Sequence, residues 1–189
     1  MNTVGIDEVG RGCWAGPLVA AAVMLDGQLD GLQDSKIISK KNRERLEAAI
    51  IENATAFGIG WVWPREIDDN GLTWAVKTAM ERALLSIQEP FDEVIIDGNI
   101  NYLHAIPHSR AIIKADNHIP AVSAASIIAK VARDRYMETT AHNTFPQYEF
   151  ESHVGYGTKR HIELLKQFGA SPEHRYCYKP IKAIQEQEA

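Results

Sequence analysis

The alternation of apolar and polar residues along the chain predicts a mixture of strands and helices. Short apolar runs that end at glycine, proline or acidic residues are typical of strands, and they occur at 2–8, 18–25, 57–63, 91–97 and 111–114. Apolar residues spaced three and four apart are typical of helices, and they occur at 40–56, 72–87, 121–141 and 159–168. The order of these elements predicts a mixed sheet with helices on both faces, in the α/β class.

Polar and turn-forming residues set the limits of these elements. Ser39 and Thr158 are each expected to cap the start of a helix. The segment 10–17, with its glycines and proline, is predicted to be a turn, and 65–71 a short connector. From residue 169 onward we expect irregular structure.

Composition places the chain among ordinary globular proteins. It has 189 residues, of which 45% are hydrophobic and 24% charged, so we expect one domain with a small C-terminal extension. No apolar run is long enough to predict a membrane span, and the run at 17–25 lacks the basic leader of a signal peptide. Cys13 and Cys177 are far apart, without metal-ligand spacing, so we expect a reducing cytoplasm.

The net charge of −5 weighs mildly against a nucleic-acid partner. Two observations weaken that objection. Carboxylates that hold metal contribute negative charge that the metal cancels, and basic residues gather locally at 36–45, 130–135 and 159–161. Each basic cluster could equally be a solvated helix face.

Acidic residues stand at or just after the ends of three predicted strands. Asp7 and Glu8 end the first and Asp97 ends the fourth, and the fifth is predicted to end in Lys114-Ala115-Asp116. Strand ends that meet at one edge of a sheet would bring these carboxylates together, where they repel one another unless cations intervene. Divalent cations such as Mg²⁺ or Mn²⁺, about 3.5–4 Å apart, would remove that repulsion and could hydrolyse a phosphate ester. Because neighbours in a strand face opposite ways, Asp7 and Glu8 can share a site only if the strand twists or ends there.

A glycine-arginine-glycine turn, formed by Gly10, Arg11 and Gly12, follows the first acids directly. Glycine lets backbone N–H groups approach a ligand closely. Acids beside bare backbone favour chemistry on a phosphate ester. A strand followed by a turn with solvated acids would have the same sequence pattern.

Several motifs together resemble ribonuclease HII, the type 2 ribonuclease H family, and they occur in the family's order. They lie at 5–12, 34–36, 96–98, 114–116, 124–134, 155–158 and 174–175. The resemblance runs from residue 3 to about residue 180, and it implies an RNase H-like fold with a five-stranded mixed sheet and a helical C-terminal region. It places a catalytic domain at 1–145 and the extension at 146–189.

The resemblance also implies an activity and roles for individual residues. The activity is endonucleolytic cleavage of RNA in RNA–DNA hybrids, and cleavage 5′ of single ribonucleotides in duplex DNA that leaves 3′-hydroxyl and 5′-phosphate ends. The implied metal-binding and catalytic residues are Asp7, Glu8, Asp97 and Asp116. The implied substrate contacts are Gly10, Arg11 and Gly12 to the ribose 2′-hydroxyl, Tyr156 to the next sugar and Lys36 to a phosphate. Further residues that could follow the DNA strand are Lys159, Arg160, His174 and Arg175, although His174 could instead brace the tail.

Two other functions use the same acids. One is a Mg²⁺-dependent phosphotransferase, against which the chain lacks a glycine-rich nucleotide loop ending in Gly-Lys-Ser/Thr. The other is a hybrid-binding module without catalysis, against which all four acids are present. We expect a monomer that binds nucleic acid and no membrane.

Overall fold

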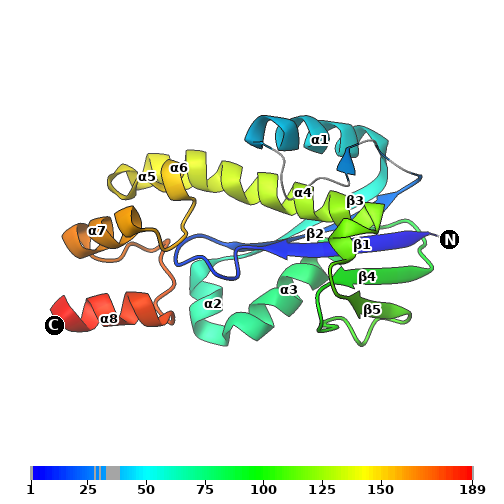
Figure 1. Ribbon diagram of the computed structural model, residues 1–189. Coiled ribbons are helices and arrows are strands. Elements are labelled where there is room, and N and C mark those ends of the chain that lie inside the picture. Colours follow the sequence, from blue (N-terminus) through cyan, green and yellow to red (C-terminus); the bar gives the residue numbers. More distant parts are fainter. Residues whose placement is uncertain (1, 28, 30, 33–38, 189) are drawn as a thin grey trace.

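The computed structural model describes residues 2–27, 29, 31–32 and 39–188, and its centre is one five-stranded sheet (Figure 1). The strands are β1 (Thr3–Val9), β2 (Leu18–Leu25), β3 (Ala54–Val62), β4 (Glu93–Asp97) and β5 (Ser109–Ile112). Their spatial order is β3-β2-β1-β4-β5. β1, β2 and β3 pair antiparallel, whereas β1, β4 and β5 pair parallel. The predicted mixed sheet of the α/β class is confirmed.

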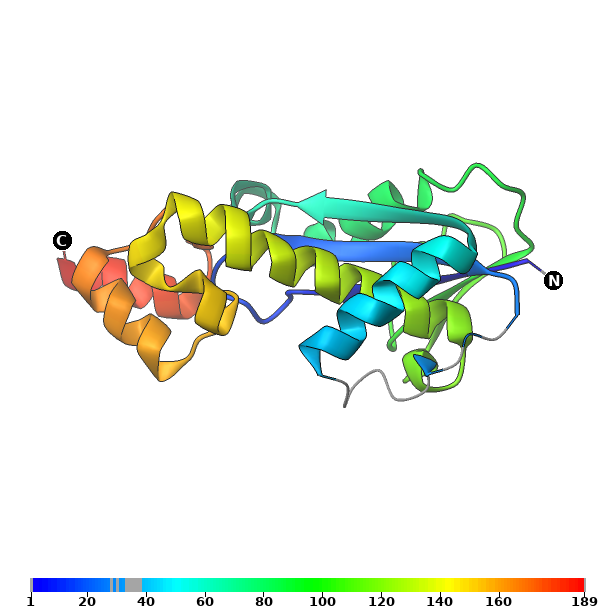
Figure 2. The ribbon, with the colours of Figure 1, turned by 90° about the horizontal axis from the view of Figure 1, so that it is seen from above.

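Helices cover both faces of the sheet and extend beyond one end of it. Those against the sheet are α1 (Lys40–Asn53), α2 (Pro64–Asn70), α3 (Leu72–Leu84) and α4 (Pro120–Tyr136). Those beyond it are α5 (His142–Thr144), α6 (Phe150–His153), α7 (Lys159–Phe168) and α8 (Lys179–Glu188). Figure 2 shows the long α4 running along the sheet toward this second group. Within the described ranges, no helix combines the length and the apolar character that crossing a bilayer requires.

Two hydrophobic cores lie on the two faces of the sheet. Val4 and Ile6 of β1 face α3, where Val76 and Met80 are also fully buried. On the other face, α4 and α1 pack on β2. Because side chains alternate along a strand, Gly5 and Asp7 of β1 face α4.

A third core holds the C-terminal helices together. It joins Ala15 and Met137 to Phe150, Leu165 and other residues of the extension. The core therefore combines residues from both sides of position 145, and the expected domain boundary there stays a prediction.

Several element limits differ from those predicted. The prediction of an irregular tail is wrong, because the tail forms α8, which buries Ile181 and Ile184 in the third core. The fifth strand begins at Ser109 rather than 111, where it pairs with Val94. It ends at Ile112, and Lys114 then adopts a left-handed conformation (φ 58°), which an extended strand cannot contain. Ser39 and Thr158 cap their helices as predicted, by accepting backbone hydrogen bonds.

Candidate active site

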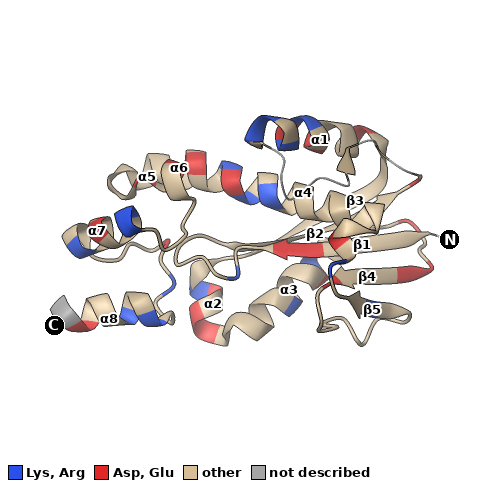
Figure 3. Ribbon diagram, in the orientation of Figure 1, with Lys and Arg blue, Asp and Glu red and all other residues tan. Residues whose placement is uncertain are grey.

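Asp7 and Asp97 lie side by side at the ends of two adjacent parallel strands. Ile6 pairs with Ile96 in the register of β1 and β4, so the next residue along each strand is an aspartate. The Glu8 N–H donates a hydrogen bond to Oδ1 of Asp7 at 2.8 Å. Figure 3 shows this acidic end of β1 turned toward the C-terminal helices. The structure thus places Asp7 and Asp97 side by side, with Glu8 next to Asp7 along β1.

Burial and like charges make this group costly to ionise. Asp7 is only 9% exposed, and burial, with the charges of Glu8 and Asp97, raises its pKa to about 8 despite a hydrogen bond with Ser126 of α4. Burial also raises the pKa of Glu8, although Arg11 opposes the shift from 3.2 Å. The group therefore retains a proton at neutral pH unless a cation replaces it.

The donor chemistry of the site fits a hard divalent cation. Oδ1 of Asp97 is buried and has no hydrogen-bond partner among the described residues, and buried polar atoms without partners are rare in proteins. Over the same ranges, no three or more His, Cys, Asp and Glu side chains form a group that could hold a metal ion. The expected four-carboxylate cluster is therefore not preformed. Mg²⁺ is commonly held by one or two carboxylates together with water and substrate phosphates, and the neighbouring carboxylates of Asp7 and Asp97 are donors of this kind.

Asp116 lies in a different element from the one predicted. It lies in a short 3₁₀ helix after β5 (Ala115–Asn117), not at the strand end, and it is 2% exposed. Its backbone carbonyl accepts a hydrogen bond from Ser123. Ser123 and Ser126 stand one turn apart on α4 and so share a face. This face of α4 is therefore tied to Asp116 and, through Ser126, to Asp7.

Two fully buried arginines hold the 10–17 loop that follows β1. Arg133 of α4 donates to the carbonyl oxygens of Pro17 at 2.9 Å and Ala15 at 3.0 Å. Arg175 donates to those of Gly10 at 2.6 Å and Gly16 at 2.8 Å. Both guanidinium groups are 0% exposed. These hydrogen bonds turn the four carbonyl groups inward. Because Arg175 is buried, the expectation that it follows the DNA strand is wrong.

The glycines of this loop differ in exposure: Gly10 and Gly16 are buried, whereas Gly12 is exposed. Gly10 has φ +95°, and a Cβ there would stand 2.6 Å from Nε of Arg133, so only glycine fits. A Cβ on Gly12 would have no neighbour within 4 Å. The backbone at Gly12 is therefore open to a ligand, as the sequence predicts. Arg11 between them is half-exposed and paired with Glu8.

Tyr156 stands beside the loop with its ring held in place. Nζ of Lys130 lies 5.4 Å and Cζ of Arg133 lies 5.9 Å from the ring centroid. Burial and a hydrogen bond with the side chain of Cys13 raise the pKa of the Tyr156 hydroxyl to about 12. The ring is nevertheless 40% exposed, so it presents an aromatic surface at the edge of the site.

Other predicted contacts fare differently. Lys36 lies outside the described residues. Arg160 is bound to Glu149 by both Nε and Nη2, and both Lys159 and Arg160 are exposed. His174 is 0% exposed, so the alternative that it braces the tail is confirmed and a contact with DNA is wrong.

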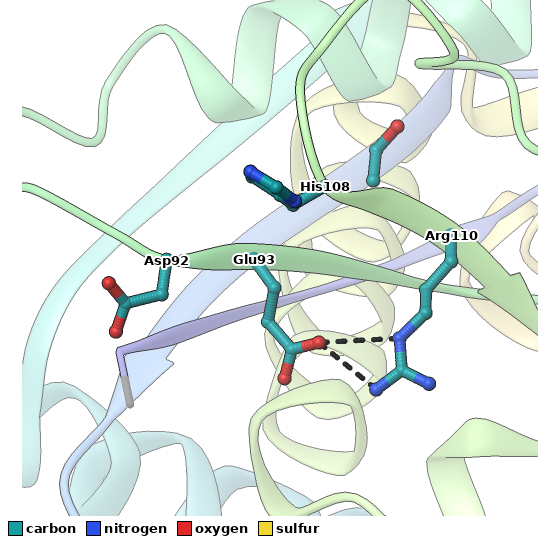
Figure 4. Close-up of a pocket in the computed structure, with 5 residues that line it drawn as sticks. Asp92, Glu93, His108 and Arg110 are labelled. Carbon is teal, nitrogen blue, oxygen red and sulfur yellow. Dashed lines mark hydrogen bonds and ion pairs between the residues drawn. The ribbon is translucent and has the colours of Figure 1, made fainter.

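A pocket of about 500 Å³ lies at the opposite end of β4 and β5 (Figure 4). Its lining includes Asp92, His108 and the ion pair between Glu93 and Arg110, whose Nη2 lies 3.0 Å from the carboxylate. Four residues of extended strand, about 13 Å, separate Glu93 from Asp97. The pocket therefore belongs to a different part of the surface from the acids.

Comparison with known proteins gives a consistent result. The protein-family model described as Ribonuclease HII matches residues 4–181 of this chain. The chain is similar to "Ribonuclease HII 1" of Methylibium petroleiphilum, at 46% identity over 96% of this chain and 91% of that one. Its structure is similar to ribonuclease H2 from Pyrococcus horikoshii, with a TM-score of 0.85 and 28% identity over 99% and 98% of the two chains. It is also similar to RNase HII from Archaeoglobus fulgidus, solved in complex with PCNA, with a TM-score of 0.79 and 28% identity over 95% and 96%.

Proposed function

Because the chain belongs to the ribonuclease HII family of metal-dependent nucleases that act on RNA–DNA hybrids, we propose that it also cuts 5′ of single ribonucleotides in duplex DNA. The products would carry 3′-hydroxyl and 5′-phosphate ends. The observation that carries the proposal is the pair Asp7 and Asp97 on adjacent strand ends, next to a glycine loop whose backbone is open at Gly12.

We propose Asp7, Glu8, Asp97 and Asp116 as the residues that hold two divalent ions, Mg²⁺ or Mn²⁺, when substrate is bound. Such ions supply activation of water for attack on phosphorus and stabilisation of the leaving 3′ oxygen. The buried, unpartnered Oδ1 of Asp97 and the raised pKa of Asp7 support this role. Ser126 keeps Asp7 oriented toward the site, and Arg11 keeps Glu8 at its edge.

We propose that the loop and Tyr156 recognise the RNA-to-DNA junction. A 2′-hydroxyl both donates and accepts hydrogen bonds, so backbone groups at Gly10, Arg11 and Gly12 can satisfy it. The exposed ring of Tyr156 would stack on the following sugar, where a second 2′-hydroxyl would fit poorly. Lys36 and Lys159 remain proposed phosphate contacts. Phosphate contacts position a duplex without reading its sequence, so cleavage should depend on salt and little on sequence.

The test is cleavage of a labelled DNA duplex that carries one ribonucleotide, in Mg²⁺, in Mn²⁺ and in chelator, beside an all-DNA duplex and a long hybrid. The expected result is one metal-dependent cut 5′ of the ribonucleotide. Asp97→Asn should abolish it, whereas Asp69→Asn, an exposed aspartate paired only loosely with Arg65 at 3.9 Å, should not.

Other results would refute parts of the proposal. Cleavage of the long hybrid alone would refute the proposed recognition of the RNA-to-DNA junction. Full activity of Asp97→Asn would remove the metal assignment. Tight binding of the hybrid without cleavage in either metal would favour the binding module. Hydrolysis of nucleoside triphosphates would favour the phosphotransferase.

We also propose that the protein acts as a monomer in the cytoplasm. Both of its cysteines are free, which agrees with a reducing compartment. The complex of the Archaeoglobus fulgidus protein with PCNA makes a sliding clamp the first protein partner to test, by size-exclusion chromatography of the two proteins alone and mixed.

A further inference from the structure

Three buried histidines lie directly behind Tyr156, and the reaction uses none of them. His153 ends α6, His161 lies on α7, and His174 lies between α7 and α8. The ring centroids of His153 and His161 are 4.3 Å apart and stacked, and those of His161 and His174 are 5.2 Å apart. Both His161 and His174 are 0% exposed, so the group is built into the fold.

The hydrogen bonds of these rings determine where their protons lie. Nδ1 of His174 lies 2.9 Å from the Ser171 N–H, which can only donate, and 3.3 Å from the Ser171 carbonyl oxygen, which can only accept. The shorter of the two contacts makes Nδ1 the acceptor, so the proton of a neutral His174 is on Nε2. That Nε2 lies 3.0 Å from Nε2 of His161, which must therefore accept. The proton of His161 is then on Nδ1, which donates to the carbonyl oxygen of Tyr156 at 2.9 Å.

This chain of hydrogen bonds exists only while both imidazoles are neutral. A second proton on His161 would place two N–H groups face to face across 3.0 Å. Burial lowers the pKa of His161 to about 4 and that of His174 to about 3, which keeps both rings neutral at physiological pH. The chain runs from the Ser171 N–H through two rings to one backbone atom of the residue proposed to contact the substrate.

The other backbone atoms around Tyr156 are fixed as well. The Gly155 N–H donates to Nδ1 of His153 at 3.2 Å, and the Tyr156 N–H donates to the His153 carbonyl at 2.9 Å. The Gly155 carbonyl accepts from the Trp14 N–H at 2.8 Å. Both peptide planes that flank Tyr156 are therefore held. The Tyr156 carbonyl accepts from His161 and also from the Thr158 N–H at 2.8 Å, so the two-histidine chain is one of two anchors of that plane. A fixed backbone sets the direction of the Cα–Cβ bond of Tyr156, and the contacts with Lys130 and Arg133 then hold the ring that this bond carries.

We propose that His161 and His174 are positioning residues that set the orientation of Tyr156 and thereby the preference for a single ribonucleotide over a long hybrid. The proposal rests on the proposed function of Tyr156. Neither histidine touches substrate. Their effect is on discrimination between substrates, because a ring that is displaced can no longer distinguish a deoxyribose from a ribose at the next position.

The experiment compares two His161 variants with a control on the same helix. His161→Leu removes both hydrogen bonds, whereas the side-chain amide of His161→Asn stands near the place of Nδ1 and can still donate to Tyr156. Leu164→Ala removes apolar volume from the same core, because Leu164 is 2% exposed. Its apolar side chain takes no part in the hydrogen bonds between the histidines. The kcat and KM of each are measured on the single-ribonucleotide duplex and on the long hybrid, with thermal unfolding to confirm folding.

We expect His161→Leu to lower the ratio of kcat/KM on the two substrates about tenfold, since small displacements in a site have effects of this size or larger. His161→Asn should restore most of the ratio, and Leu164→Ala should leave it unchanged. An equal fall in Leu164→Ala, or no difference between His161→Leu and the wild type, would overturn the proposal.

A double-mutant cycle makes the test independent of stability. In a Tyr156→Ala background, His161→Leu should not change the ratio further, because its effect passes through the tyrosine. A second, additive fall would overturn the proposal. The imidazole nitrogen chemical shifts should also show neutral His161 with its proton on Nδ1 and neutral His174 with its proton on Nε2, and the opposite pair of tautomers would overturn it.

The two proposals fail differently. A wild-type protein that does not cleave the single-ribonucleotide duplex refutes the proposed function, and this inference with it. A wild-type protein that cleaves it, with an unchanged ratio in His161→Leu, refutes the positioning role alone.

Discussion

Replacement of Asp7 by asparagine should stabilise the metal-free protein while it abolishes cleavage. The Asp7 carboxylate is buried and faces the charges of Glu8 and Asp97. Asparagine has nearly the same shape, and its Oδ1 can still accept the hydrogen bond from the Glu8 N–H. The substitution thus removes a charge that is costly in the folded state and changes little else.

The size of the effect follows from the pKa of Asp7, which the fold raises from 3.8 to about 8. The folded protein binds this proton more tightly than the unfolded chain, so stability is full below pH 4 and falls as the pH rises toward 8. At about 1.4 kcal/mol per pH unit, the loss reaches about 4 kcal/mol at pH 7 and about 6 kcal/mol above pH 8. Asp7→Asn should avoid this loss, so its advantage over the wild type should grow with pH over this range.

Urea unfolding in chelator at pH 5, 7 and 9 measures the advantage, with Asp69→Asn as the matched control. Addition of Mg²⁺ should then stabilise the wild type by mass action and narrow the gap, because Asp7→Asn lacks one ligand. An Asp7→Asn protein that is no more stable than the wild type at pH 9 in chelator would refute the reasoning.

Further predictions concern the segments around the site. Gly155→Ala should lower the free energy of unfolding by about 3 kcal/mol, since φ is +85° and a Cβ would stand 2.3 Å from a carbonyl oxygen. Gly71→Ala, with φ +82° and ψ +165° but no neighbour within 4 Å, should show the backbone strain alone, about 2 kcal/mol, in the same thermal melts. Because folding lowers the pKa of His174, its contribution is full above pH 6.5 and lost below it. The stability difference between the wild type and His174→Asn should therefore shrink by about 1.4 kcal/mol per unit as the pH falls from 6.5 to 5, and parallel urea curves would contradict this. Arg175→Lys should cost about 3 kcal/mol and most of the cleavage rate, since an ammonium cannot replace the forked guanidinium. Arg65→Lys, with 93% of the side chain exposed, should change neither.

The sequence allowed prediction of those parts of the site that depend on strand order and alternation. Acids after apolar runs correctly indicated that Asp7 and Asp97 would meet, because strand ends gather at one edge of a sheet. The prediction that Asp116 stands at a strand end was wrong. The sequence does not show that β5 ends early and that Lys114 adopts a left-handed conformation. The backbone of Gly10, Arg11 and Gly12 was predicted to be open to a ligand; the structure exposes Gly12 and buries Gly10, and the absence of a side chain does not decide between these outcomes.

The parts that could not be predicted depend on contacts between distant segments. Arg133 and Arg175 look like surface cations in the sequence, and only their burial shows that they bind backbone carbonyls. A loop with many carbonyls and no sheet partner needs buried donors, but this need does not identify which arginines supply them. The same holds for α8, where Ile181 and Ile184 stand three apart in a segment too short and polar to stand out without the core that receives them.

The buried guanidinium of Arg175 also has a consequence for how the protein is made. It binds the Gly10 carbonyl across 165 positions of sequence. At about 5–20 residues per second of synthesis, the ribosome needs roughly 10 to 30 s to proceed from one to the other. Throughout that interval the 10–17 loop lacks the donor that orders it, although β1 and its acids already exist. A nascent chain therefore carries its carboxylates long before it can present an ordered substrate loop, and competence for cleavage should arise late in synthesis.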